Sequence, residues 1–422
     1  MKFKIISLGC KVNSYECSSL ASLLMQDGHI EAKDEPNEEV GIAIINTCSV
    51  TAVADKKSRQ HIRKLINLYP NAITCVMGCY SQKAHVFIRD EIKANIIVGT
   101  SNRGKIPEYI KQYLKDKKQI DATEDKPRFF SYEEMGITSY NENIRAYLKI
   151  QDGCDNFCSY CIIPFTRGRS RSRDPKEIIK EAKYLIEKGY KEIVITGIHV
   201  GGYGKDLVGY TFSDLIDELS SLPNLYSLRI SSIEESEIDE KLINLVKTRN
   251  NIAKHLHIPL QSGSSTVLER MNRKYDCNQF LSTLKRIREE IPNIALTTDV
   301  IVGFPGESEE EFNETYNFIK ECDFNMLHVF PFSARENTKA IRMPNQIDPN
   351  IKKQRVDTLL KLSDELWDAY TNQFLNKVVD VLVEEFDNNT HLNRGHTTNY
   401  LEVSFQNDDS YVGKVVKTKY RK

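Results

Sequence analysis

The sequence lacks the features that would place the chain in a membrane or on a secretory route. Its longest apolar runs, GIAIIN and EIVITG, are much shorter than the ~20 apolar residues that a membrane-spanning helix needs. The N-terminal segment KFKIISLGC has neither the long apolar core nor the cleavage site of a signal peptide. We therefore expect a cytoplasmic protein with no membrane partner.

Excess charge of either sign is also missing, because 58 lysines and arginines oppose 59 aspartates and glutamates, a formal net charge of −1. Any surface for a polyanion must therefore be a local patch. No Walker motif, Ser-His-Asp set or dinucleotide fingerprint is evident, since LGCKVN and GGYG do not supply GxGxxG. The ten cysteines, in contrast, indicate metal or redox chemistry in a cytoplasmic chain, where disulfides are rare.

Three of these cysteines form a compact C-x3-C-x2-C motif at Cys154, Cys158 and Cys161, in the run QDGCDNFCSYCIIPFTRGR. Three thiolates on one short loop can hold a [4Fe–4S] cluster, and the lack of a fourth cysteine nearby leaves one iron open. Clusters that only carry electrons usually have four cysteine ligands, so the open iron indicates chemistry at the metal. The alternatives are a zinc site, which would need a fourth ligand, or buried thiols. Phe157, inside the motif, could pack on an adenine face or shield the cluster.

Residues 1–113 predict a small α/β domain with a parallel sheet, because strand-like segments alternate with helical ones. The expected strands are 4–9, 41–47, 72–78 and 95–100. Cys10, Cys48 and Cys79 each follow one of the first three strands directly. Since the carboxyl ends of parallel strands meet at one edge, these thiols could hold a second cluster. The alternative is three independent buried thiols. The other cysteines lack this placement and are interpreted as structural: Cys17, Cys75, Cys277 and Cys322.

The rest of the chain divides into a linker and two further domains. Residues 114–139 are charged and without periodicity, which predicts the linker. Residues 140–370 resume the alternation of strands and helices and predict a partial (β/α)6 barrel whose active edge carries the cysteine motif. Residues 373–422 change to short strands and predict a small β-barrel. Six barrel strands are expected, at 146–153, 192–197, 225–232, 254–260, 295–303 and 326–332.

Loops at the active edge of the predicted barrel carry residues suited to a nucleotide-like ligand. Gly201 and Gly202 would let backbone approach a ligand closely, although a plain turn explains them as well. Ser232 and Gln261 end the third and fourth strands and could bind ribose hydroxyls. Asp299 lies within a strand, which also fits a residue of the barrel interior.

Basic residues gather in three places: the run RGRSRSR after the cysteine motif, the helix expected after Cys48, and the C-terminal end. Each could be a solvated face. Two of them adjoin cysteine loops, which suits RNA with its target base splayed out of a loop. A small β-barrel with a basic end is also typical of nucleic-acid binding. The residues that we predict to contact RNA are Lys56, Lys57, Arg59, Arg167, Arg169, Arg171, Arg173, Lys414, Lys417 and Lys419.

The cysteine motif after a first barrel strand resembles the radical S-adenosylmethionine (SAM) superfamily. More narrowly, LGCKVN, INTCSVT and VMGCYSQ, followed by that core and a C-terminal barrel, resemble the methylthiotransferase family over essentially the whole chain. The segments KIQDGC, NFCSYCIIP, TGIHVGGYG, RISSIEESEI, HLHIPLQSGS and DVIVGFPGE are most similar to the branch that modifies N6-threonylcarbamoyladenosine in tRNA. The branches that modify isopentenyladenosine in tRNA or ribosomal protein S12 are the alternatives. The C-terminal barrel is shorter than the family's TRAM domain usually is.

The resemblance implies a transferase with two [4Fe–4S] clusters and SAM as cofactors. The C-x3-C-x2-C cysteines, here named the radical-SAM site, would hold the cluster at which SAM is cleaved to methionine and a 5′-deoxyadenosyl radical. Cys10, Cys48 and Cys79, here named the auxiliary site, would hold the cluster that supplies or relays sulfur. A second SAM would methylate that sulfur, and the radical would abstract the C2 hydrogen of the adenine. No general acid or base stands out in the sequence.

The same resemblance implies three partners: a tRNA substrate, a flavodoxin- or ferredoxin-type electron donor, and a sulfur source. Cofactor chemistry would perform the difficult step while the protein positions it. A protein of another class, a non-catalytic iron–sulfur protein that binds RNA or transfers electrons, would not consume SAM.

Overall fold

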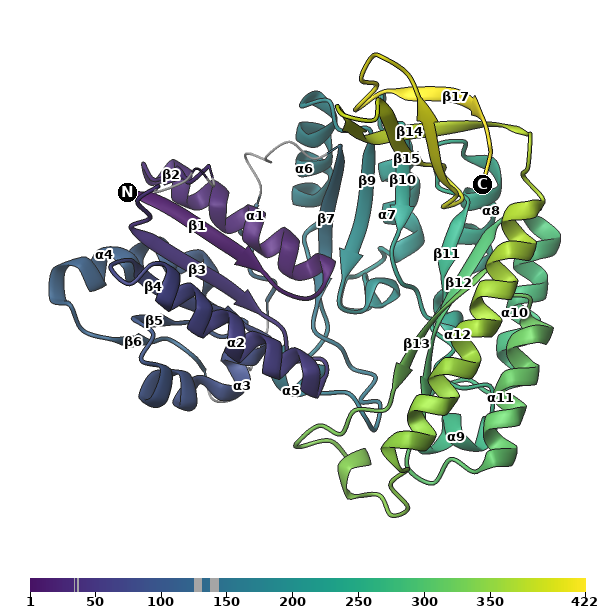
Figure 1. The fold of residues 1–422 in the computed structure, drawn as a ribbon, viewed down its shortest axis with the longest axis horizontal. Helices are drawn as coiled ribbons and strands as arrows, with labels where there is room; N and C mark the ends of the chain where they lie inside the picture. Colours follow the sequence, from purple (N-terminus) through teal and green to yellow (C-terminus); the bar gives the residue numbers. More distant parts are fainter. Residues whose placement is uncertain (34, 36–37, 125–130, 137–143) are drawn as a thin grey trace. The chain divides into compact units, whose positions relative to one another are not determined.

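The fold is shown in Figure 1, a computed structural model that describes residues 1–33, 35, 38–124, 131–136 and 144–422. The chain forms two compact units. The first unit contains Met1–Asn141, Tyr147–Glu181 and Ser333–Ile341. The second contains Glu142–Ala146, Ala182–Phe332 and Arg342–Lys422. The predicted boundary between linker and barrel, at residues 139 and 140, lies outside the described residues.

The first unit is built on a six-stranded sheet in the order β2-β1-β3-β4-β5-β6, and its neighbouring strands pair in parallel. Both β3 and β4 are buried along their whole length, because their apolar runs are covered on two faces. The predicted parallel sheet is confirmed, and β6 extends it into the predicted linker. The strands are β1 (Lys2–Ser7), β2 (Ile30–Glu31), β3 (Ile42–Thr47), β4 (Ile73–Gly78), β5 (Ile96–Ile97) and β6 (Ile120–Asp121).

Helices cover both faces of this sheet (Figure 1). On one face, Leu20 and Leu24 of α1 and Ile106 of α4 share a core with Ile44. On the other, Ile62 of α2 packs with the remaining face of the strands. The helices of this part are α1 (Lys11–Gln26), α2 (Ala52–Leu68), α3 (Cys79–Phe87), η1 (Ile88–Ile92), η2 (Arg103–Lys105) and α4 (Ile106–Asp116).

A loop closed by two strands carries the cysteine motif. The strand β7 (Arg145–Asp152) runs into the motif, and β8 (Arg171–Ser172) returns antiparallel to it, with Asp152 opposite Arg171. Between them lies the short helix α5 (Ile163–Thr166). The chain then enters α6 (Pro175–Glu187), the helix whose cap, proline and glycine signals are clearest in the sequence. The motif is therefore held at both ends by one strand pair.

The second unit alternates strands and helices. Its strands β9 and β10 pair in parallel, as do β11, β12 and β13, and parallel bridges such as Leu228–Ile252 connect the two sets. All six predicted barrel strands are present, β7 among them, so the radical-SAM-type α/β fold is confirmed. The strands are β9 (Glu192–Gly197), β10 (Ser227–Ile230), β11 (His255–His257), β12 (Ala295–Val302) and β13 (Met326–Pro331).

The helices of the second unit begin where the sequence supplies capping residues. Capping boxes at Thr211, Asp276 and Ser308 start α7, α10 and α11, because each side chain accepts from a backbone N–H of the first turn. None of the described helices is long and apolar enough to cross a membrane. The elements are η3 (Val200–Gly202), α7 (Phe212–Ser220), η4 (Glu235–Glu237), α8 (Glu240–Thr248), α9 (Ser265–Arg270), α10 (Cys277–Glu290), α11 (Glu309–Cys322), η5 (Ala340–Arg342, at the end of the first unit) and α12 (Pro349–Asn372).

The C-terminal residues form a four-stranded antiparallel sheet in the order β16-β15-β14-β17. Val381, Val383 and Leu401 pack with Tyr370 at the end of α12, so the sheet shares a core with the rest of the second unit. The prediction of a small C-terminal β-structure is confirmed. The strands are β14 (Val378–Asp387), β15 (Leu392–His396), β16 (Glu402–Gln406) and β17 (Val415–Lys419).

Tyr400 connects this sheet to the barrel strands of the second unit. Its ring lies 4.5 Å from the guanidinium carbon of Arg229 and 4.5 Å from the ring of His255. Arg229, in turn, pairs with the buried Glu192 at 2.9 Å. Burial alone would raise the pKa of Glu192, but Arg229 and Arg145 hold it below its ordinary value. A stacked ring and a buried ion pair thus join two elements that are distant in sequence.

We expect Tyr400→Ala to lower the thermal midpoint of unfolding of the second unit by about 4 °C, because it removes both ring contacts and leaves a space beside Arg229. Differential scanning calorimetry would measure the shift. His391→Ala, in an exposed turn of the same sheet, is the matched control. Equal midpoints for the two variants would contradict the connecting role of Tyr400.

The pKa of Glu192 also predicts a pH dependence. Because its pKa is lower in the folded state, the stability that it contributes is present above its ordinary pKa of about 4 and is lost as the pH falls. We therefore expect Glu192→Gln to lower the thermal midpoint of unfolding most at pH 7. The difference in midpoint between this variant and the parent protein should become smaller below pH ~4. Calorimetry across this range would check it, with the exposed Glu365→Gln as control. A difference that stays constant with pH would contradict the ion pair.

Candidate functional site

The three cysteines of the auxiliary site follow three neighbouring strands of the first sheet. Cys10 comes after β1 and lies at the N-cap position of α1, without a capping hydrogen bond from its side chain. Cys48 comes after β3, and Cys79 comes after β4 and is the first residue of α3. The strands β1, β3 and β4 are adjacent, so their carboxyl ends lie side by side. Helix N-termini carry partial positive charge and favour thiolates. The placement expected from the sequence is therefore observed.

The backbone at Gly9 lets two of these cysteines approach each other. Gly9 has φ +101°, and a Cβ there would lie 2.7 Å from the Cys48 Cβ and 2.9 Å from its Sγ. Burial raises the pKa of the Cys48 thiol, and the charge of Cys10 adds to this. Burial also raises the pKa of Cys79 to about 11, with Arg167 opposing and with Cys10 and Cys48 adding. The three thiols are thus close enough to affect one another, and Cys10 is the exposed one.

Arg167 contacts the auxiliary site from the segment after the cysteine motif. Its Nε–H donates to the Cys79 Sγ at 3.2 Å. Its other nitrogens donate to Glu16 at 2.8 Å, to Asp152 at 3.1 Å and to the Asn13 Oδ1 at 3.1 Å. The side chain is completely buried. One guanidinium therefore connects α1, the end of β7 and a cysteine of the auxiliary site.

Two buried carboxylates, Glu16 and Asp152, form the centre of this network. The ammonium of Lys149 lies 2.9 Å from Glu16 and 2.6 Å from Asp152. Arg171 pairs with Asp152 at 3.4 Å, and Arg103 pairs with both carboxylates. Burial would raise the pKa of each carboxyl, but these cations hold both well below their ordinary values. Both carboxylates therefore stay ionised in the interior.

The radical-SAM site is a tightly turned loop. The Cys154 N–H donates to the Gly168 carbonyl at 3.1 Å, and the Cys161 N–H donates to the Cys158 carbonyl at 3.0 Å. Gly153 has φ +72°, and a Cβ there would lie 1.9 Å from the Arg169 carbonyl, so only glycine fits. The three thiols are partly exposed. The loop thus presents them to a ligand while its backbone is fixed.

The donor sets of both sites suit iron–sulfur clusters. Each site offers three cysteine sulfurs, the ligands that such clusters prefer, and the described cysteines are all free of disulfides. The buried guanidinium of Arg167 beside Cys79 suits an anionic cluster. Among the described residues, no group of three or more histidine, cysteine, aspartate or glutamate side chains already surrounds a single metal position.

Phe157, predicted near SAM, is 40% exposed and lies beside the radical-SAM site. Its φ of 48° is unusual for a bulky residue, and the Arg169 guanidinium carbon lies 5.4 Å from its ring centroid. Both of its predicted roles, packing on an adenine or shielding the cluster, stay predictions.

Gly201 and Gly202 are explained by their protein neighbours. A Cβ at Gly201 would lie 2.1 Å from the Glu237 Oε2, and one at Gly202 would lie 2.8 Å from the His199 Nδ1. The side chains of His199 and Glu237 form a pair at 2.9 Å. Any larger residue at 201 or 202 would collide with Glu237 or His199, so glycine is needed beside this pair. A role of Gly201 and Gly202 in SAM binding stays a prediction.

Ser232, Gln261 and Asp299 lie at one edge of the second unit's strands. Ser232 forms a parallel bridge with His257, and the Gln261 N–H donates to the Asp299 carbonyl at 2.9 Å. The Asp299 Oδ1 lies 3.3 Å from the His257 Nε2. The sequence reasoning missed His257, although its spacing of two from His255 in a strand could have indicated a shared face. Whether these residues bind SAM stays a prediction.

The predicted RNA contacts need correction in the run RGRSRSR. Arg167, Arg171 and Arg173 are all buried, and Arg173 pairs with Glu181 at 2.7 Å. A buried, paired guanidinium cannot reach a polyanion on the surface, so the prediction was wrong for these three. Arg169 alone of the four is exposed, although it pairs with Asp155 at 2.9 Å.

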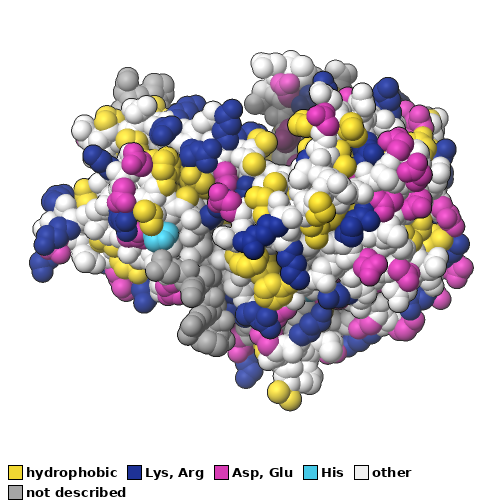
Figure 2. Space-filling view, turned by 90° about the horizontal axis from the view of Figure 1, so that it is seen from below, with side chains coloured by type: hydrophobic (Ala, Val, Ile, Leu, Met, Phe, Trp, Pro, Cys, Tyr) yellow, Lys and Arg dark blue, Asp and Glu magenta, His cyan; other side chains and the backbone are white. Residues whose placement is uncertain are grey.

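The other basic residues remain available at the surface. Lys56 and Lys57 are exposed on α2, whereas Arg59 is half-buried and donates to the Tyr80 hydroxyl at 3.4 Å. The face in Figure 2 shows lysine and arginine side chains in small groups among acidic ones, in keeping with the near-zero net charge. The C-terminal lysines are also exposed: Lys414, Lys417 and Lys419.

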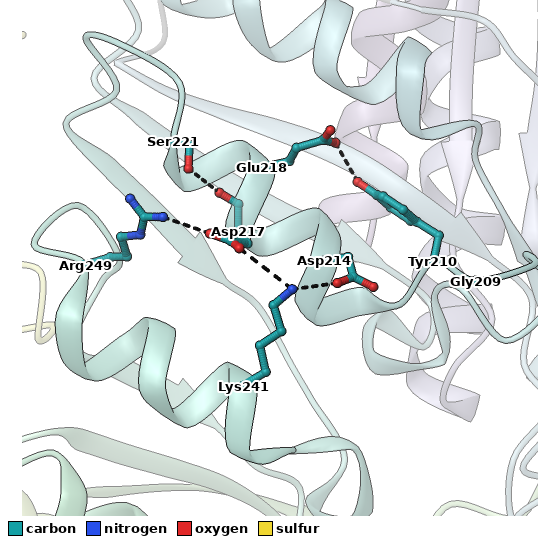
Figure 3. A pocket seen from close by; sticks show the side chains of 8 residues that line it. All are labelled: Gly209, Tyr210, Asp214, Asp217, Glu218, Ser221, Lys241 and Arg249. Carbon is teal, nitrogen blue, oxygen red and sulfur yellow. Dashed lines mark hydrogen bonds and ion pairs between the residues drawn. The ribbon is translucent and has the colours of Figure 1, made fainter.

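A separate pocket of about 550 Å³ lies between α7 and α8 of the second unit (Figure 3). Lys241 pairs there with Asp214 at 2.6 Å, and Arg249 pairs with Asp217 at 2.9 Å. The Tyr210 hydroxyl donates to Glu218 at 2.6 Å. The charged groups of this pocket thus satisfy one another, and none of the predicted site residues lines it.

Comparison with known proteins identifies the family. The family model described as "Radical SAM superfamily" matches residues 148–319, and that described as "Uncharacterized protein family UPF0004" matches residues 2–99. The chain is similar in fold to the radical S-adenosylmethionine methyltransferase TsrM from Kitasatospora setae, with a TM-score of 0.57, 14% identity, and coverage of 78% of this chain and 72% of that one.

Curated relatives match over nearly the whole chain. It is 46% identical to the threonylcarbamoyladenosine tRNA methylthiotransferase MtaB of Bacillus subtilis (strain 168), over 99% of this chain and 93% of that protein. It is 34% identical to the tRNA-2-methylthio-N(6)-dimethylallyladenosine synthase of the same organism, over 99% of this chain and 83% of that protein. The protein is therefore an enzyme of the transferase class, and it belongs to the radical SAM methylthiotransferase family.

Proposed function

We propose that this protein adds a methylthio group to C2 of N6-threonylcarbamoyladenosine next to the anticodon of tRNA. The observation that carries the proposal is the 46% identity, over nearly the full length, to a protein named for threonylcarbamoyladenosine. The relatives named for dimethylallyladenosine are 34–35% identical. That nucleoside, which is isopentenyladenosine, is the alternative substrate.

The cysteines that we propose as ligands are those of the radical-SAM and auxiliary sites. When bound, two [4Fe–4S] clusters and SAM supply the radical and the sulfur. The chain's own residues hold these groups: Gly153 and Gly168 fix the radical-SAM loop, and the sheet edge positions the auxiliary cysteines. The radical-SAM thiols are partly exposed and Cys10 is exposed, which leaves each site accessible to a further ligand.

The residues that we propose to contact SAM are those at the strand ends of the second unit, together with Phe157. The backbone N–H of Gln261 donates a hydrogen bond to the backbone carbonyl of Asp299. This hydrogen bond fixes the positions from which the two side chains extend at the edge of the strands. Asp299 is paired with His257, which keeps its carboxylate oriented. Ser232 is exposed beside them and can donate to a hydroxyl.

The tRNA contacts that we propose are Lys56, Lys57 and Arg169 in the first unit and the C-terminal lysines in the second unit. These side chains are exposed, and lysine and arginine contacts to phosphates dominate RNA affinity. The set has six of the ten residues expected from the sequence, because three arginines are buried and Arg59 is half-buried against Tyr80. We also propose a flavodoxin- or ferredoxin-type electron donor and an external sulfur source as partners.

Iron content tests the two cluster sites. We expect anaerobic reconstitution to give about eight irons per chain, falling to about four in Cys48→Ala and in Cys158→Ala, because each variant loses one cluster. Cys277→Ala, a partly buried thiol outside both sites, should keep about eight. An unchanged iron content in Cys48→Ala would contradict the auxiliary site.

Nucleoside mass spectrometry tests the substrate. In tRNA from cells that lack the protein, we expect the threonylcarbamoylated nucleoside to lose its methylthio group and the isopentenylated nucleoside to keep it. The purified protein should release 5′-deoxyadenosine from SAM after reduction. If the isopentenylated nucleoside loses its methylthio group instead, the protein belongs to the branch that modifies isopentenyladenosine. If ribosomal protein S12 changes and tRNA does not, the substrate is not RNA. A lack of 5′-deoxyadenosine would favour a non-catalytic iron–sulfur protein.

A further inference from the structure

A single buried segment of the first unit contacts both cysteine sites. The Arg167 Nε lies 3.2 Å from the Cys79 Sγ of the auxiliary site. The carbonyl of the next residue, Gly168, accepts from the Cys154 N–H of the radical-SAM site at 3.1 Å. Two consecutive residues therefore bind one cysteine of each site.

Buried charges of both signs surround Arg167. Four buried cations, Arg103, Lys149, Arg167 and Arg171, face the two buried carboxylates Glu16 and Asp152. Glu133, at the partly exposed edge of the network, pairs with Arg103. Among the described residues of this cluster, four cations thus face three carboxylates. The cations outnumber the carboxylates, which suits a further anion beside Arg167.

The position of that anion is indicated by the hydrogen bond of Arg167 to Cys79. Glu16 and Asp152 each have several cationic partners, whereas the Cys79 Sγ receives this one directed N–H. An oxidised [4Fe–4S] core bound by three thiolates is a net anion and becomes more negative on reduction. Hydrogen bonds to the sulfurs and nearby positive charge raise the reduction potential of such a cluster.

We propose that Arg167 is a positioning residue of the auxiliary cluster: it donates a hydrogen bond to the Cys79 sulfur and provides the cluster's buried counter-charge. The carbonyl of Gly168 accepts a hydrogen bond from Cys154 in the radical-SAM loop. Binding of a cluster at the auxiliary site would therefore also order the radical-SAM loop through this segment. The inference rests on the proposed auxiliary cluster and adds a residue outside its ligand set.

The test uses the full chain with the radical-SAM cysteines changed to alanine, so that the auxiliary cluster is observed alone. The variants are Arg167→Gln, which removes the positive charge, and Arg167→Lys, which keeps the charge but removes the guanidinium Nε–H that donates to the Cys79 sulfur. Arg63→Gln, at an exposed position of α2 in the same unit, is the control. Iron content, electron paramagnetic resonance of the reduced cluster and its midpoint potential are measured after anaerobic reconstitution.

We expect Arg167→Gln to weaken cluster retention by about ten-fold or more, as loss of a supporting hydrogen bond does at metal sites. The cluster that remains should have a more negative midpoint potential. Arg167→Lys should keep most of its iron, with a potential also below that of the parent chain. Arg63→Gln should match the parent in both measurements.

Iron content and potential equal to the parent in both Arg167 variants would overturn the inference. If Arg167→Gln does not fold, Arg167→Lys decides the question, because a merely structural arginine predicts no shift of the potential. If the parent chain itself retains no iron, the auxiliary site of the proposed function fails. If it retains iron and the Arg167 variants are unchanged, only the role of Arg167 fails.

Discussion

The pairing of buried cations with two buried carboxylates holds the first unit in its functional arrangement. Glu16 lies on α1, Asp152 ends β7 and Arg167 follows the cysteine motif, so their contacts join three distant parts of the sequence. Desolvation of each charge costs several kcal/mol, and only the close opposing charges offset it. Replacing one partner would leave an uncompensated charge, so the network strongly disfavours other arrangements of these elements.

This constraint acts together with the geometry of the parallel sheet. Adjacent strands bring Cys10, Cys48 and Cys79 to the same edge, where the helices that follow begin. The partial positive charge of helix N-termini favours thiolates there, as does the charge of Arg167. Burial works against them, since it raises the pKa of Cys48 and Cys79. Binding of a metal cluster would resolve this conflict, because it deprotonates the thiols that it binds.

The sequence was a good guide wherever local spacing determines position. The strands and the strand-end cysteines follow from periodicity and from the rule that ligands gather at the carboxyl edge of a parallel sheet. It was a poor guide at RGRSRSR, where alternating arginines resemble an exposed basic strip. Three of them are buried because Glu16, Asp152 and Glu181 are brought next to them by tertiary contacts. At glycines 201 and 202 the structure shows which protein side chains an added Cβ would meet, Glu237 and His199, and the SAM-binding role of these glycines stays a prediction.

The sequence by itself determined the two sets of three cysteines, the order of the α/β elements and the family resemblance, because each depends on spacing along the chain. Only the tertiary structure decided which charges lie in the interior and which face solvent. It also showed that Arg167 and Gly168 connect one cysteine of each site. The physical reason is that burial depends on partners far away in sequence, and no local pattern records whether an arginine will find a carboxylate, a thiol or water.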